Sequence, residues 1–83
     1  MDLADIAARI EEGVPEADAE VTRARGAHDD DHLAARGISP AFDGESLVDR
    51  HQRVYDALDG LMTEEIHALE VETYTPSEWE ERA

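Results

Sequence analysis

The pattern of apolar and polar residues changes period along the chain, and each change marks an expected element. From Ser46 onward apolar residues recur at steps of three and four, which predicts an amphipathic helix with one buried face. Ser46 and Asp49 form a capping box that begins this helix. From Ile66 to Tyr74 the period shortens to two, which predicts a strand with one apolar and one acidic face. The predicted apolar face of the helix consists of Leu47, His51, Val54, Tyr55, Leu58, Leu61 and Met62.

Weaker patterns precede this helix. Apolar residues at helical spacing over Asp2 to Glu12 predict a first helix, and Gly13 is placed to end it in the left-handed conformation that glycine adopts readily. A weak alternation over Ala17 to Arg25, and a second run from His32 or Leu33 to Ile38, predict two strands. The loop between these strands carries three consecutive aspartates at positions 29–31.

The C-terminal residues repeat the capping motif. Thr75 and Glu78 form a second capping box, and Pro76 takes the favoured first helical position. This predicts a short helical turn that folds Trp79 back onto the domain. The order helix, strand, strand, helix, strand, short helix predicts a single α+β domain over residues 1–83, with helices covering one face of a three-stranded sheet.

Charge changes the picture of how this domain behaves in solution. The chain has 22 acidic residues against 7 basic ones, all of them arginine, and a net charge of −15. High charge with few aromatic residues is typical of disorder, but the regular helix and strand patterns favour a folded domain. We therefore interpret the composition as adaptation to molar salt, as in an extreme halophile, where counterions screen the repulsion. The same interpretation predicts that the chain loosens or unfolds in dilute buffer.

Several classes of function are disfavoured. The absence of cysteine excludes a disulfide, a thiol nucleophile and a thiolate ligand from this chain. We find no charged segment followed by an apolar run at the N-terminus and no apolar stretch of bilayer length, so we expect no signal peptide, no membrane association and a cytoplasmic location. The strong acidity disfavours phosphate backbones. No nucleophile is paired with a base in the sequence, so we do not expect an enzyme.

The histidines are the candidates for site chemistry. A neutral imidazole is a common ligand for iron, zinc and copper, and the chain has four, His28, His32, His51 and His67. Their spacing matches no established metal motif. Each also has a structural interpretation: His67 as a boundary residue, His51 as a core group, His32 as a strand-opening residue and His28 as an exposed loop residue. The residues alone leave both interpretations open.

Four blocks of the sequence resemble the BolA family. They are Phe42-x-Gly44, Leu47-Val48-x-Arg50-His51-x-x-Val54-Tyr55, Ile66-His67-Ala68-Leu69 and Thr73-Tyr74-Thr75-Pro76. The resemblance covers Phe42 to Trp79. Before Phe42 the chain lacks the family's aspartate-glutamate-serine segment and its H-A-G-H loop. The resemblance implies an αββαβ, KH-like fold of class II, which agrees with the predicted order of elements.

The resemblance also implies a function in iron–sulfur cluster assembly and iron homeostasis. BolA-like proteins pair with monothiol glutaredoxins and glutathione, and the pair binds or relays a bridging [2Fe–2S] cluster, whereas the isolated chain is expected to hold none. The family's ligand histidine corresponds to His67. A second ligand from the loop between the first two strands corresponds to His28, with His32 as the next candidate.

Two other functions remain open at this point. The KH-like fold suggests a nucleic-acid-binding transcriptional regulator, although the chain has no G-x-x-G loop and carries the wrong charge for nucleic acid. A metal-free acidic interaction domain is the other alternative. Self-association as a homodimer is also possible when the partner is missing.

Overall fold

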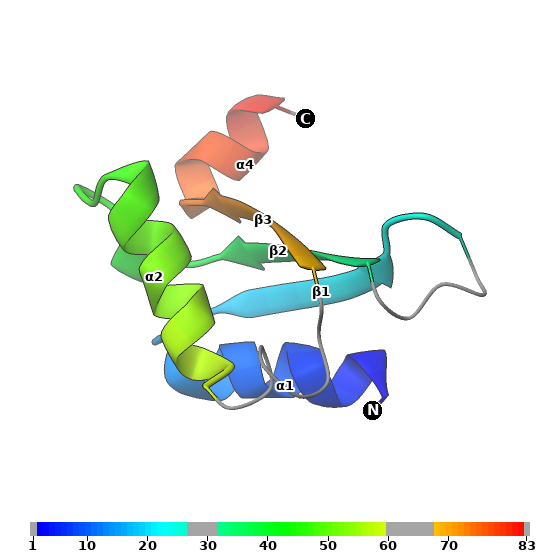
Figure 1. Cartoon of the computed structure of the whole chain (residues 1–83). Helices are drawn as coiled ribbons and strands as arrows, with labels where there is room; N and C mark the ends of the chain where they lie inside the picture. The colour runs from blue at the N-terminus through cyan, green and yellow to red at the C-terminus, as the bar shows by residue number, and fades with distance from the viewer. Residues whose placement is uncertain (1, 27–31, 60–67, 83) are drawn as a thin grey trace.

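The predicted order of elements is confirmed by the computed structural model, which describes residues 2–26, 32–59 and 68–82 (Figure 1). Leu61, Met62 and Ile66, which the sequence placed in the helix and the last strand, lie outside the described residues. The described elements are α1 (Leu3–Gly13), β1 (Asp18–Arg23), β2 (His32–Ile38), the 3-10 helix η1 (Pro40–Phe42), α2 (Leu47–Ala57), β3 (Ala68–Tyr74) and α4 (Pro76–Arg82).

The sheet is mixed, with strand order β1-β2-β3. β1 runs antiparallel to β2, whereas β3 runs parallel to β2 in a register that pairs His32 with Ala68 and Ile38 with Tyr74. A parallel pair needs a crossover connection, and α2 lies in that connection. α1 and α2 cover one face of the sheet as predicted, and α4 lies on the other side (Figure 1).

The core lies between the sheet and these two helices. Residues on β2 alternate strictly, so that Leu33 and Ala35 are buried on the helix side while Arg36 points to the other face. Phe42 of η1 is fully buried. The remaining buried apolar residues are Ile6, Ile10, Val14, Val21, Val54 and Leu58.

Both predicted capping boxes begin helices. Ser46 Oγ accepts a hydrogen bond from the Asp49 N–H at 3.1 Å. At the start of α4, Thr75 Oγ1 accepts a hydrogen bond from the Glu78 N–H at 3.2 Å, and Glu78 Oε1 accepts one from the Thr75 N–H at 2.8 Å. These bonds satisfy N–H groups that have no partner inside the helix. α4 extends for seven residues, longer than the single turn predicted.

A buried serine joins three parts of the chain. Ser39 has no exposed surface, and its Oγ donates to the Pro15 carbonyl at 2.6 Å while accepting from the Ala41 N–H at 3.0 Å. Its own N–H donates to the Tyr74 carbonyl at 2.9 Å. Ser39 therefore fixes the start of η1 against both the α1–β1 connection and the end of β3.

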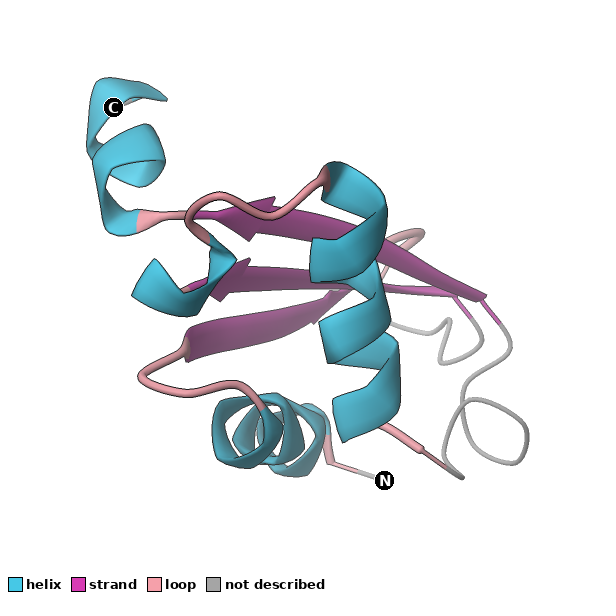
Figure 2. Cartoon of the chain, turned by 90° about the vertical axis from the view of Figure 1, so that its left-hand side faces the viewer, coloured by secondary structure: helices cyan, strands magenta, loops and turns pink. Residues whose placement is uncertain are grey.

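Two further details of the sequence-based prediction were wrong. Gly13 does not adopt a left-handed conformation; it is the last residue of α1, and the extended Val14 caps the helix. A Cβ on Gly13 would lie 2.5 Å from the Ala57 Cβ, so glycine allows α1 and α2 to approach closely. Leu47 is 62% exposed rather than buried, because α2 begins beyond the edge of the sheet formed by β3 (Figure 2).

Candidate functional site

Two of the four candidate histidines lie in the described parts of the chain. His32 opens β2 and is half-buried. His51 lies half-buried on α2, and its Nε2 is buried without a hydrogen-bond partner among the described residues. His67 and His28, the predicted metal ligands, lie outside the described residues.

The strand register brings together residues that are close in sequence to His28 and His67. His32 pairs with Ala68 across the parallel strands. Ala68 directly follows His67 in sequence, and His32 comes four positions after His28. The chain therefore enters β2 and β3 side by side at one end of the sheet, although the predicted ligands are distant in sequence.

A hollow of about 240 Å³ lies at this end of the sheet. Its lining includes one histidine and one glutamate, whose side chains can bind a metal through nitrogen and oxygen. It also includes one arginine, whose guanidinium can bind an anion. Within the described ranges no group of three His, Asp or Glu residues could hold a metal by itself. A metal bound here would need further ligands from the rest of the chain or from a partner. The lining residues are Ala24, Arg25, His32, Leu33, Ala68 and Glu70.

At the opposite end of β3, Arg50 joins α2 to α4. Its Nη1 and Nη2 donate to the two carboxylate oxygens of Glu78 at 2.7 and 3.3 Å, and its Nε donates to the Glu45 carbonyl at 3.1 Å. The hydrogen bonds from Arg50, followed by that from the Thr75 backbone, lower the pKa of Glu78 to about 2. Glu78 in turn raises the pKa of Arg50. Arg50 is therefore committed to this pair and does not form an anion site.

A second arginine cluster holds α4 on the open face of the sheet. The guanidinium groups of Arg36 and Arg82 lie over the Trp79 ring, at 4.5 and 4.8 Å from its centroid. The Tyr74 ring lies 5.3 Å away, centroid to centroid. Cation–π contacts of this kind are attractive, and they confirm the prediction that Trp79 folds back onto the domain.

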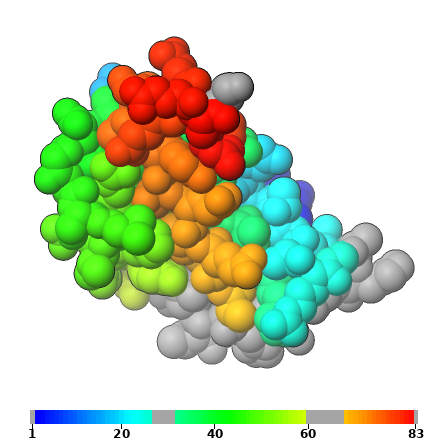
Figure 3. Space-filling model, turned by 90° about the horizontal axis from the view of Figure 1, so that it is seen from above, coloured from blue at the N-terminus to red at the C-terminus, as the bar shows by residue number. Residues whose placement is uncertain are grey.

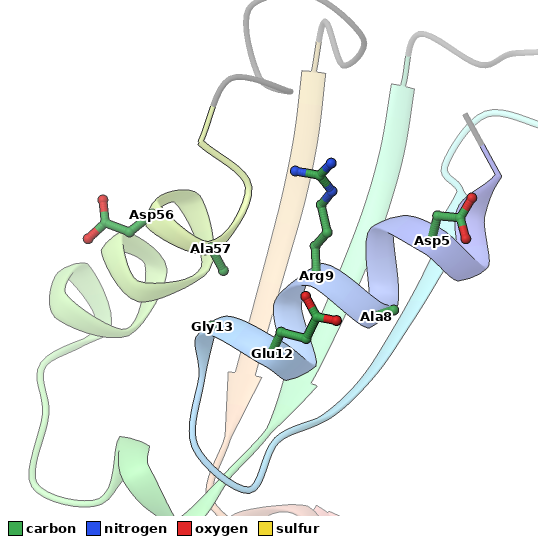
Figure 4. Close-up of a pocket in the computed structure, with 7 residues that line it drawn as sticks. All are labelled: Asp5, Ala8, Arg9, Glu12, Gly13, Asp56 and Ala57. Carbon is green, nitrogen blue, oxygen red and sulfur yellow. The ribbon is translucent and has the colours of Figure 1, made fainter.

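A wide groove lies between α1 and α2 and has a volume of about 760 Å³ (Figure 4). It is wide and open, and its only cation is Arg9. The carboxylate of Asp56 points away from Arg9 rather than towards it. Because its side chains do not converge, we do not assign chemistry to this groove. Its lining consists of Asp5, Ala8, Arg9, Glu12, Gly13, Asp56 and Ala57.

Fold and sequence together define the class of protein. The family model described as BolA-like protein matches residues 14–78, and the chain therefore belongs to the BolA-like protein family. A BolA protein homologue from Coxiella burnetii superimposes with a TM-score of 0.76 at 40% identity, covering 96% of this chain and 97% of that one. The BolA1 protein of Mus musculus gives a TM-score of 0.81 at 30% identity, covering 96% of this chain and 69% of the mouse chain.

Curated relatives extend beyond the matched region. The DNA-binding transcriptional regulator BolA of Escherichia coli (strain K12) is 37% identical over 49 residues, which are 59% of this chain and 47% of that protein. The SufE-like protein 1, chloroplastic/mitochondrial, of Arabidopsis thaliana is 42% identical over 57 residues, which are 65% of this chain and 15% of the plant protein. This chain thus spans about half or less of these two relatives. No helix within the described residues is long and apolar enough to cross a bilayer.

Proposed function

We propose that this chain is a non-catalytic cytoplasmic adaptor that pairs with a monothiol glutaredoxin and glutathione, and shares a [2Fe–2S] cluster with them. His67 is the proposed ligand, and His28 is the candidate second ligand. The observation that carries the proposal is the register of β2 and β3 in a member of the BolA-like family, since it pairs His32 with Ala68, the residue next to His67.

The donor set of this chain fits a shared cluster rather than a resident one. The chain has no cysteine, so every thiolate must come from the partner and from glutathione. At the described end of the sheet, His32 lines a hollow of about 240 Å³, and we place the partner at this end. Replacing a thiolate by a neutral imidazole raises the reduction potential of a cluster. Because only the neutral imidazole binds metal, acidification should release the cluster from this chain.

The test is a titration of cluster-loaded monothiol glutaredoxin and glutathione with this protein in molar KCl. Visible absorption and circular dichroism should change and reach a limit at one equivalent. His67→Ala should abolish the change, and His28→Ala should weaken it if this histidine is the second ligand. His51→Gln on α2 is the matched control and should titrate like the wild type.

Other results would contradict the adaptor function. An unchanged spectrum, with far-ultraviolet circular dichroism showing a folded protein in the same salt, would overturn it. Wild-type behaviour of His67→Ala in both cluster and partner-binding assays would favour the metal-free interaction domain.

A nucleic-acid-binding regulator is the second candidate, favoured by the name of the Escherichia coli relative. The net charge of −15 opposes it, since phosphate neutralisation supplies most of the sequence-independent affinity for DNA. Fluorescence anisotropy with a labelled duplex, titrated across salt concentrations, separates the two candidates. An affinity that rises steeply as salt falls would support the regulator, and no binding at the lowest salt that keeps the protein folded would exclude it.

A further inference from the structure

β3 has a free edge. In the three-stranded sheet, β3 pairs with β2 on one side, and no described strand pairs with its other side. Figure 3 shows β3 (orange) at the surface between the start of α2 (green) and α4 (red). An unpaired edge presents backbone N–H and C=O groups that a further strand can bind.

The two faces of this edge strand differ in character. Glu70 and Glu72 are exposed on the open face of the sheet, while Leu69 and Val71 are half-buried on the face that carries the helices. The alternation follows from the two-residue period of a strand. A strand added at this edge would thus meet carboxylates on one face and aliphatic side chains on the other.

The start of α2 adds apolar surface to the same region. Leu47 is 62% and Val48 is 75% exposed, and they are the exposed large hydrophobic residues of the described chain. They lie in the first turn of α2, which projects beyond β3 on the helix-bearing side (Figure 2). Exposed apolar residues that adjoin one another commonly mark a docking surface.

We propose that the free edge of β3 binds an extended segment of a partner protein in which basic and apolar residues alternate. The basic residues face Glu70 and Glu72, and the apolar residues lie on the side of Leu69 and Val71. This interaction goes beyond the proposed cluster function, because it needs neither a metal nor a histidine.

The negative charge of β3 and of the whole chain supports a basic segment as the partner that binds this edge. Opposite charges at directly facing positions stabilise a strand pair, and like charges destabilise it. A second copy of this chain pairing through β3 would place glutamates close to glutamates, and each copy carries a net charge of −15. The same field accelerates the approach of a basic segment. Glu70 and Glu72 therefore oppose self-pairing and favour a basic partner strand.

The experiment uses two synthetic octapeptides, one alternating lysine and valine and the other alternating glutamate and valine. Amide hydrogen exchange of the full chain is measured by NMR in the lowest salt that keeps the protein folded. The lysine peptide should slow exchange along β3, and the glutamate peptide should not. Glu70→Lys with Glu72→Lys should reverse this preference, with affinity for the lysine peptide falling about tenfold for two reversed charge pairs.

Two further variants distinguish binding at the edge of β3 from a general attraction between a basic peptide and an acidic protein. Glu12→Lys with Asp56→Lys makes the same charge change in the groove between α1 and α2 (Figure 4), and it should leave protection of β3 unchanged. Val48→Ser changes an exposed side chain and should weaken binding without altering the fold. The proposal would be overturned if both peptides protected β3 equally, or if neither protected it in the folded protein. It would also be overturned if the Glu12→Lys, Asp56→Lys variant lost as much affinity for the lysine peptide as the Glu70→Lys, Glu72→Lys variant. Because these readouts involve no cluster, they succeed or fail independently of the adaptor function.

Discussion

The contact between Gly13 and Ala57 allows two opposing predictions for the substitution Gly13→Ala. Helix propensity alone favours it by at most about 1 kcal/mol, the difference between alanine and glycine in a helix interior, because Gly13 is the last residue of α1. In this structure, however, the added Cβ would lie 2.5 Å from the Ala57 Cβ and 3.0 Å from the Ala57 Cα. The second atom belongs to the backbone of α2, so rotation of a side chain cannot relieve the contact.

The cost of the clash exceeds the gain in helix propensity. Ordinary contacts between carbon atoms begin at about 3.5 Å, so α2 must move by roughly 1 Å, and overpacking of this kind costs about 1–3 kcal/mol. Subtracting at most about 1 kcal/mol of propensity from the middle of this range, about 2 kcal/mol, leaves a loss of at least about 1 kcal/mol in the free energy of unfolding. For a domain of this size, that loss lowers Tm by about 4–8 °C.

Thermal unfolding in molar KCl, followed by circular dichroism, measures this loss. Ala57→Gly provides the matched partner, because it removes the methyl group that the new Cβ meets. The double variant should lose less stability than the sum of the two single losses, which is the mark of residues in contact. A Gly13→Ala protein that melts at or above the wild-type temperature would refute the explanation of this glycine by close helix packing.

Three other substitutions test the hydrogen bonds and ring contacts. The pKa of Glu78 lies at about 2, below its ordinary value of 4.5, so its pair with Arg50 stabilises the fold fully above about pH 4.5 and is lost as the pH falls towards 2. The difference in Tm between wild type and Glu78→Gln should stay constant near neutral pH and shrink through this acidic range. Ser39→Ala should lower the free energy of unfolding by about 1–3 kcal/mol in denaturant titration, because it leaves buried hydrogen-bonding groups without a partner. Arg36→Gln removes one guanidinium from Trp79, the single tryptophan, and should shift its fluorescence to longer wavelength; an unchanged spectrum would contradict the stacking.

Elements that depend on neighbouring residues could be predicted from the sequence. Ser46 and Thr75 begin helices as expected because each capping box operates within three residues. The true role of Gly13 could not be predicted in this way, because it depends on Ala57 in another helix. The exposure of Leu47 was missed for a similar reason: helical periodicity shows which residues share a face, but not where the sheet beneath that face ends.

At the candidate site, too, local features could be predicted from the sequence, whereas contacts between distant residues could not. The order of elements and the family resemblance were available from the sequence, and the family is confirmed. The pairing of His32 with Ala68 required the strand register, which no local motif specifies. The ion pair between Arg50 and Glu78 depends on how α4 returns to α2 after β3, so the residues next to Arg50 in the sequence could not predict it. The roles of His67 and His28 stay predictions.

The two proposals meet on β3. This strand begins at Ala68, beside His32 and next in sequence to the proposed ligand His67, and it runs to Tyr74 beside α4. Seven residues of strand extend over roughly 23 Å, so a basic segment paired along the free edge would reach the end where a cluster is proposed to be shared. A homodimer formed through this edge would place like charges together. Molar salt shortens the Debye length to about 3 Å and so weakens both this repulsion and the attraction of a basic strand, but it creates no attraction between two acidic copies. We therefore expect a partner with a basic strand to bind this edge in preference to a second copy, and to approach the His32 end of the sheet as it does so.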